Sequence, residues 1–177
     1  AVVGSFAGPR TAAAGVLVYT AAWAWMFLGF VANVVAVARD PRGRISFPGV
    51  SVFAGLIWLL ASMFWYAARL FAGAPEPPSL ALLMGFAAQV LIGTMSYLIP
   101  TTMGGGPAAV RAGLAELARA GWLRVIAFNA GLAGWLAADS PAAQGVFRII
   151  AFVALVSFLP LMARAARVQV SAIKGLS

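Results

Sequence analysis

Residues 80–100 read LALLMGFAAQVLIGTMSYLIP, a stretch without a single charged side chain. A helix needs about 20 consecutive apolar residues to cross the hydrocarbon core of a bilayer. Over the whole chain of 177 residues, 63% are hydrophobic and 9% are charged, whereas soluble domains carry about 25% charged residues. The sequence therefore predicts an all-α integral membrane protein and excludes a water-soluble globular domain.

Five stretches are long and apolar enough to span a bilayer, and each is bounded by proline, glycine or charged residues. We expect spans over residues 12–38, 48–71, 80–99, 122–138 and 146–162, with Pro100 ending the third. Residues 107–120 differ, because Val110, Leu114 and Leu117 share one side and Arg119 lies opposite. This pattern predicts an amphipathic helix in the membrane interface with its apolar stripe toward the acyl chains; a solvated connector is the alternative.

These elements make one transmembrane domain over residues 1–177. The first residue is Ala1, and no typical signal peptide follows it. We therefore expect the chain to be a fragment of a larger protein, with further membrane helices supplied from outside it.

Cations predict the orientation of the bundle. The 12 Lys and Arg residues outnumber the 4 Asp and Glu residues, and in so apolar a chain they mark cytoplasmic loops and contacts with anionic lipid rather than nucleic acid. With five spans, most cations share one side: Arg39, Arg42, Arg44, Arg111, Arg119, Arg124, Arg164, Arg167 and Lys174. The N-terminus is then outside and the C-terminus cytoplasmic.

Small and polar residues predict how the helices pack, because lipid offers no hydrophobic force between them. They recur every four residues in the third span (Gly85, Gln89, Gly93, then Ser96) and in the fourth (Ala130, Gly134, Ala138, with Ala127 and Gly131 beside them). Gln89 and Asn129 lie halfway along antiparallel spans, near the bilayer midplane. We expect the two amides to face inward and bond to each other or to backbone; a ligand contact is the alternative.

Candidate ligand residues are few. The chain has no Cys and no His, which excludes disulfides, thiolate or imidazole catalysis and the usual ligands of zinc, haem and copper. We identify no catalytic residue. The residues that could contact a cofactor are Gln89, Asn129, Tyr97 and Arg148. The candidate thioether ligands for Cu(I) are Met95 and Met103, together with Met84. Methionines at helical spacing favour packing instead. Gly104-Gly105-Gly106, ahead of a helix, predicts a nest for a lipid phosphate.

The stretch from Gly85 to Pro100, continued by Met103-Gly104-Gly105-Gly106-Pro107-Ala108-Ala109-Val110-Arg111 and then by Arg124 to Gly131, resembles the N-terminal membrane region of actinobacterial multicopper oxidase and copper nitrite reductase-like proteins. In that family a multi-span module precedes external cupredoxin domains. The resemblance implies a bacterial cytoplasmic membrane and copper held in an associated domain. Since this chain lacks His and Cys, none of the family's metal ligands maps onto it.

Three functions are consistent with these observations. The first is a membrane domain, without a catalytic site of its own, that anchors or supports an external copper redox enzyme. The second is an electron-transfer subunit that binds quinol or haem together with a partner chain. The third is a small transporter of an anion or of Cu(I). A homo-oligomer is compatible with each of them.

Overall fold

The computed structural model describes residues 8–39, 46–74 and 76–175. About 89% of these residues are helical, and no strand occurs among them. Four helical segments within the described residues are long and apolar enough to cross a membrane: Arg10–Ala36, Phe47–Phe71, Ala81–Met103 and Pro141–Lys174. This is the architecture of a helical membrane protein, as the composition predicted.

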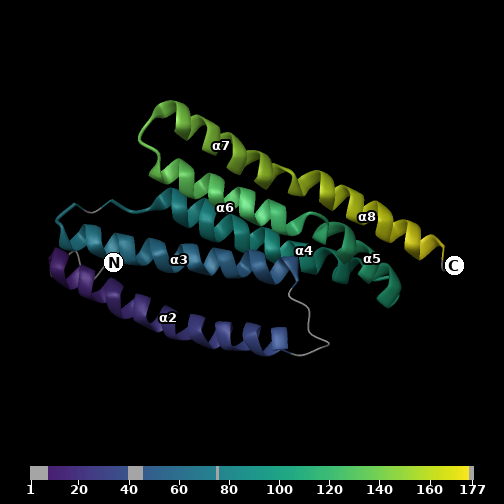
Figure 1. The fold of residues 1–177 in the computed structure, drawn as a ribbon. Helices are drawn as coiled ribbons and strands as arrows, with labels where there is room; N and C mark the ends of the chain where they lie inside the picture. The colour runs from purple at the N-terminus through teal and green to yellow at the C-terminus, as the bar shows by residue number, and fades with distance from the viewer. Residues whose placement is uncertain (1–7, 40–45, 75, 176–177) are drawn as a thin grey trace. The chain divides into compact units, whose positions relative to one another are not determined.

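Figure 1 shows the helices in chain order, from purple at the N-terminal end to yellow at the C-terminal end. In chain order they are α2 (Pro9–Arg39), α3 (Phe47–Phe71), the π-helix η1 (Ala81–Ala88), α4 (Gln89–Met103), α5 (Gly106–Ala118), α6 (Gly121–Ala137), α7 (Pro141–Val156) and α8 (Phe158–Lys174). The described residues divide into two compact units. The first holds residues 8–39, 55–74 and 76–87, and the second holds residues 46–54 and 88–175.

In the first unit, α2 and the later part of α3 are apolar nearly all round. Trp25 of α2 is 78% exposed and Trp65 of α3 is 60% exposed, which suits a surface solvated by lipid rather than by water. Gly85 of η1 packs closely on Trp58, because a Cβ at Gly85 would lie 2.5 Å from Trp58 Cγ. Gly85, one of the small residues predicted to mediate packing in the third span, therefore lies in a contact between η1 and α3.

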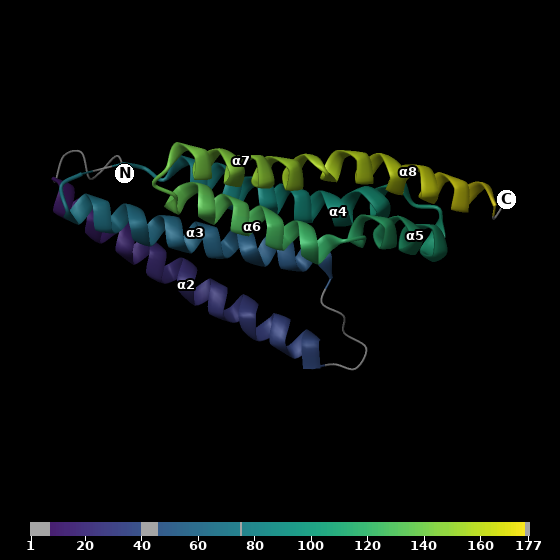
Figure 2. The ribbon, with the colours of Figure 1, turned by 45° about the horizontal axis from the view of Figure 1, so that its top comes forward.

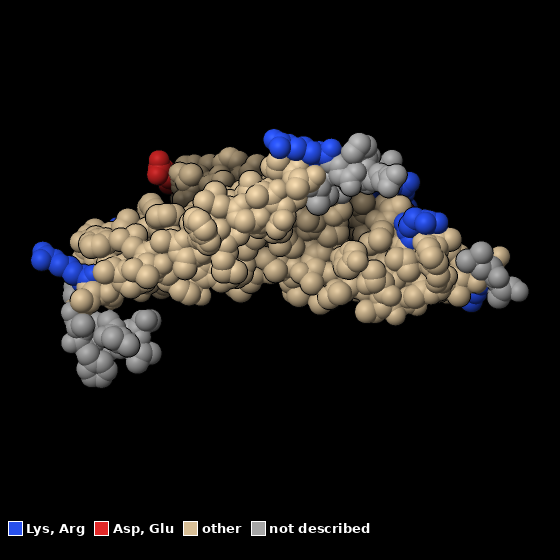
Figure 3. All heavy atoms as spheres, turned by 90° about the horizontal axis from the view of Figure 1, so that it is seen from below, with Lys and Arg blue, Asp and Glu red and all other residues tan. Residues whose placement is uncertain are grey.

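Most of the surface visible in Figure 3 is uncharged, with a few separate Lys and Arg side chains. The sequence explains this distribution for α2, where Thr11 to Ala38 contains no charged residue between Arg10 and Arg39. Arg42 and Arg44, which belong to the predicted cationic loop after the first span, lie outside the described residues.

The second unit is built on a long antiparallel hairpin. α6 packs on α7, with Gly131 against Ala151 and Gly134 against Phe147. α5 packs on α8, with Gly113 against Gln169. In each pair the residue number rises on one helix as it falls on the other. α5 continues the direction of α6, and α8 that of α7 (Figures 1 and 2).

The predicted contact face of the fourth span is confirmed at Gly131 and Gly134 but not at Ala130. A Cβ on Gly131 would lie 2.7 Å from the backbone nitrogen of Ala151, and one on Gly134 would lie 2.5 Å from the Phe147 ring. Ala130 is exposed. The expectation that Ala130 lies in the contact is therefore wrong, and Gly131 takes its place because only a residue without a Cβ permits this approach of the two backbones.

Two prolines act differently from the expectation. Pro100 does not end the third span, because α4 runs through it to Met103. The hydroxyls of Thr101 and Thr102 bond to the carbonyls of Tyr97 and Leu98 beside it, at 2.9 and 2.8 Å. Hydroxyls of this kind make proline tolerable in membrane helices.

The second proline divides the predicted fifth span. α7 ends at Val156, α8 begins at Phe158, and helix then continues to Lys174. Pro160 lies four residues after Val156, whose carbonyl it cannot bond. The Ser157 hydroxyl donates to the carbonyl of Ala154 at 2.7 Å and supports the break.

A helix, α5, is present where the amphipathic interfacial helix was predicted, but part of its apolar stripe has different neighbours. Leu117 is 1% exposed and lies in a cluster with Phe158 and Ala165 of α8. The expectation that Leu117 faces acyl chains is therefore wrong, because α8 covers it. Val110 and Leu114 are half-buried.

Candidate functional site

A polar pair lies at the centre of the second unit. Gln89 Nε2 donates to Asn129 Oδ1 at 3.1 Å, and Asn129 Nδ2 donates to Gln89 Oε1 at 2.9 Å. Asn129 Nδ2 also donates to the carbonyl of Val125 at 2.7 Å. Gln89 is 3% exposed. The prediction that these two amides turn inward and bond to each other is confirmed.

The pair lies on a buried ridge of α4 that also supports α3. The buried residues of α4 are Gln89, Gly93, Ser96 and Pro100. The Ser51 hydroxyl donates to the backbone carbonyl of Gln89 at 2.9 Å, and a Cβ at Gly93 would lie 2.8 Å from the carbonyl of Pro48. The first turns of α3 therefore rest directly on the backbone of α4.

A small cavity of about 30 Å³ adjoins the pair. Its polar wall comes from Ser51, Gln89 and Arg124, and the rest of its lining is largely apolar, including Phe47, Ile92 and Phe128. A buried water needs roughly 10–15 Å³ of such volume and two to four polar partners. The cavity has room for one or two waters and is too small for an organic substrate.

Gln169 of α8 is a second buried amide, which the sequence analysis did not identify. Its Nε2 donates to the carbonyls of Pro100 and Gly104, at 2.7 and 2.9 Å, and its side chain is 0% exposed. The last carbonyls of a helix lack intrahelical donors, so Gln169 caps α4 from a distant helix. A signal existed: Phe158, Ala165 and Gln169 share the buried stripe of α8.

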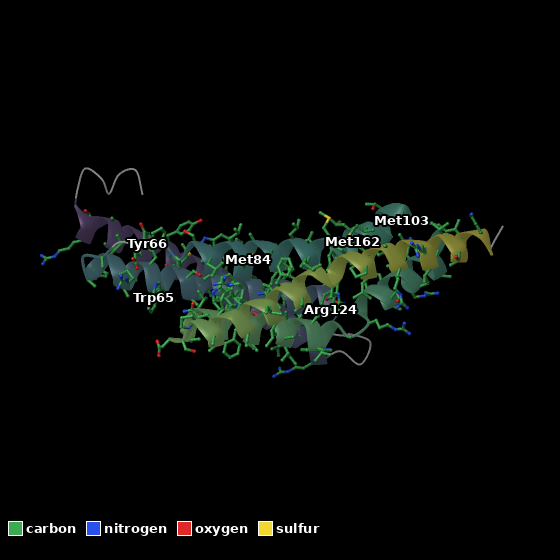
Figure 4. The ribbon with its side chains drawn as sticks, turned by 90° about the horizontal axis from the view of Figure 1, so that it is seen from above. Trp65, Tyr66, Met84, Met103, Arg124 and Met162 are labelled. Carbon is green, nitrogen blue, oxygen red and sulfur yellow. The ribbon has the colours of Figure 1, made fainter. Side chains whose placement is uncertain are left out.

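Arg124, at the junction of α5 and α6, was predicted only as a cytoplasmic cation (Figure 4). Its Nη2 donates to the carbonyls of Leu117 and Arg119, and its Cζ lies 4.5 Å from the ring centroid of Phe47. Arg124 therefore ends α5 by taking its last carbonyls. Beside it, Ala120 adopts φ 51°, which begins the new helix.

The other predicted contact residues do not gather around the amide pair. Tyr97 is 55% exposed on α4, and Arg148 is exposed on α7 with its Cζ 4.8 Å from the Trp135 ring centroid. Met95 packs against the cluster of Leu117, Phe158 and Ala165. Met103 lies at the C-terminal end of α4, 37% exposed (Figure 4).

The glycine turn before α5 is in contact with side chains of α8. Gly104, Gly105 and Gly106 have φ values of 69°, 86° and 84°, which glycine adopts readily. A Cβ at Gly105 would lie 2.2 Å from Ile173 Cγ1, and the carbonyl of Gly104 accepts from Gln169. These glycines allow α8 to approach the turn, and the phosphate expected there stays a prediction.

Two ion pairs connect different segments of the chain. Arg69 Nη2 is 3.0 Å from Glu76 Oε2, and Arg164 Nε is 2.9 Å from Glu116 Oε1. The first pair joins the end of α3 to the connector that follows it, and the second joins α8 to α5.

Comparisons with protein families, with curated proteins and with solved structures give no match for this chain. The resemblance to the membrane region of multicopper oxidase-like proteins therefore stays a prediction from the sequence.

Proposed function

We propose that this chain is a membrane-embedded anchor and scaffold for an external redox enzyme, without a reaction centre of its own. The observation that carries the proposal is the closed Gln89–Asn129 pair. An amide pair in the middle of a membrane helix marks either a transport path or a structural contact. Here the amides bond to each other, and the adjoining cavity of about 30 Å³ has the size of trapped water.

The antiparallel hairpin supports five membrane crossings. α6 has 17 residues, a length of about 25 Å at 1.5 Å per residue, close to the ~30 Å of a hydrocarbon core. It packs antiparallel along α7 through Gly131 and Gly134. If α7 crosses the bilayer, α6 returns through nearly the same depth. The crossings are then α2, α3, η1 with α4, α6, and α7.

The same arrangement supports a cytoplasmic position for α5 and α8. These helices extend the hairpin beyond α6 and α7 (Figure 2). They carry Arg111, Arg164, Arg167 and Lys174, and Arg119 directly follows α5. By the positive-inside rule this end faces the cytoplasm, so the N-terminus is outside. In this arrangement α5 stands alongside α8 rather than lying flat in the interface. The compartment is a bacterial cytoplasmic membrane by the resemblance alone.

The partner we propose is a copper enzyme on the outer face, on the strength of the resemblance over residues 85–131. The test is isolation of the tagged protein from its native membrane in a maltoside detergent, followed by metal analysis and a visible spectrum. We expect copper at a fixed ratio to the chain and no haem band. A haem spectrum, or a preparation without copper, would contradict this partner.

Transport is tested separately in liposomes. The anchor role predicts that Cu(I) and chloride permeability are the same with the wild-type chain, with Gln89→Leu and with empty liposomes. Uptake that requires the wild-type chain and is lost in Gln89→Leu would overturn the anchor role.

A further inference from the structure

Arg124 is oriented by contacts within the chain. Both of its hydrogen bonds come from Nη2, to the carbonyls of Leu117 and Arg119. The guanidinium carbon lies 4.5 Å from the ring centroid of Phe47, within the range of a cation–π contact. These contacts orient the planar guanidinium and leave the N–H groups of Nη1 unused within the described part of the chain.

The charge of Arg124 is not balanced by a carboxylate of the described residues, since none of the ion pairs there includes it. Glu116 is nearby in sequence, but its Oε1 lies 2.9 Å from Arg164 Nε and 3.7 Å from Arg119 Nη1. Arg119 and Arg164 therefore share the one carboxylate of Glu116, and Arg124 is left without an ion-pair partner among the described residues. A half-buried cation without a carboxylate partner favours an external anion.

Two features indicate that the anion is a phosphate: the level of the α5–α6 junction in the membrane and the planar guanidinium of Arg124. Trp122, two residues before Arg124, is 58% exposed, as an aromatic anchor at the headgroup level would be. A guanidinium presents donors in a planar fork that matches phosphate oxygens. Arg119, whose carbonyl accepts from Arg124 and whose side chain is 63% exposed, is a second cation beside it.

We propose that the α5–α6 junction binds a phosphate group, with Arg124 as the fixed donor and Arg119 as the second cation. In the membrane this phosphate belongs to an anionic phospholipid of the cytoplasmic leaflet, an assignment that rests on the proposed function. The phosphate site itself does not depend on the number of crossings. A phosphate bound at this junction would also accept hydrogen bonds from the Nη1 N–H groups of Arg124, which the described residues leave unused.

The first test maps the reaction of phenylglyoxal with arginines on the wild-type protein in maltoside micelles, which contain no phosphate. Phosphatidylglycerol is added in one arm and millimolar inorganic phosphate in another. We expect phosphatidylglycerol to slow modification of Arg124 about ten-fold, the effect of one or two charge-assisted hydrogen bonds. Arg148, which also lies on an aromatic ring, is the internal control and keeps its rate.

Each other outcome overturns part or all of the proposal. Equal protection by inorganic phosphate would keep the site and remove its assignment to lipid. Protection by neither, or equal protection of Arg148, would overturn the site. Because the reaction is mapped in micelles, its result is independent of the sidedness of the chain in a membrane.

The second test uses variants. Arg124→Gln removes the charge but retains an amide donor for the carbonyl of Leu117, and Arg148→Gln is the matched control. Native mass spectrometry counts the phosphatidylglycerol molecules retained per chain. We expect Arg124→Gln to weaken retention about ten-fold and Arg148→Gln to retain the wild-type number. Equal retention by a folded Arg124→Gln would contradict the proposal; if that variant does not fold, the protection of wild-type Arg124 decides.

Discussion

The Gln89–Asn129 pair is stable in an apolar interior because each amide supplies both the donor and the acceptor that the other needs. Reciprocal bonds of 3.1 and 2.9 Å join them, and Asn129 has a further bond to the carbonyl of Val125. An unpaired amide in the same place would be costly. The pair therefore fixes the register of α4 against α6.

Replacing one amide leaves the other without its partner. We expect Gln89→Leu and Asn129→Leu each to destabilise the folded protein, with the double variant less destabilised than the sum of the two. The coupling expected for a hydrogen bond in a membrane protein is about 0.6–1.7 kcal/mol. Equilibrium unfolding in mixed detergent micelles measures it, and strictly additive effects would show that the pair carries no coupling.

The contact between α6 and α7 requires glycine at position 131, whereas position 145 tolerates a larger residue. Gly131→Ala would set a Cβ 2.7 Å from the backbone nitrogen of Ala151, so α6 and α7 must separate, at a cost of about 1–3 kcal/mol. Gly145→Ala is the matched control, because nothing lies within 4 Å of its Cβ position. There the better helix propensity of alanine gives a neutral or stabilising effect, up to about 1 kcal/mol. Equal losses of unfolding free energy for the two variants would contradict this packing.

At the scale of elements, Gln169 joins three segments that are distant in sequence. It lies on α8, bonds to the end of α4 and to the glycine turn, and packs against Gly113 of α5. Because these helices bury few large side chains besides Leu117 and Phe158, one buried amide contributes substantially to their association.

Loss of this amide is expected to loosen the α5–α8 end while leaving α6 and α7 intact. In Gln169→Leu, amide hydrogen exchange over residues 101–106 and 166–174 should become about ten-fold faster. Gln144→Leu is the control, because Gln144 Nε2 caps the carbonyl of Ala138 at the opposite end, at 2.8 Å. Faster exchange throughout both α6 and α7 in Gln169→Leu would show that the two ends are not independent.

The sequence was sufficient to predict the helices and the central pair, and insufficient for the helix junctions. Span positions depend on local hydropathy, and α2, α3 and α6 begin and end within a few residues of the expected bounds. Gln89 and Asn129 were predictable because polar residues halfway along apolar spans need partners. The spacing of Phe158, Ala165 and Gln169 could place Gln169 on the buried stripe of α8. Its partners and those of Arg124 were not predictable, because they are backbone carbonyls of other segments. The break between α7 and α8 is an exception among the helix junctions, because Pro160 alone predicts it.

At the scale of the whole molecule, the apolar helices place the chain in a membrane, and the account depends on an odd number of crossings. In the arrangement we propose, with five crossings, the α5–α8 end of the hairpin and the junction at Arg124 lie on the cytoplasmic side. An even number would leave both ends of the chain on one side of the membrane. The Lys and Arg residues would then no longer gather on one side, as the positive-inside rule predicts.

Labelling of single cysteines tests this directly, because the chain contains no cysteine of its own. Thr11→Cys, Ala142→Cys and Ser171→Cys are each exposed to a membrane-impermeant maleimide, on intact cells and again after permeabilisation. The account predicts that residues 11 and 142 react on intact cells and that residue 171 reacts only after permeabilisation. Labelling of residues 11 and 171 from the same side would contradict it.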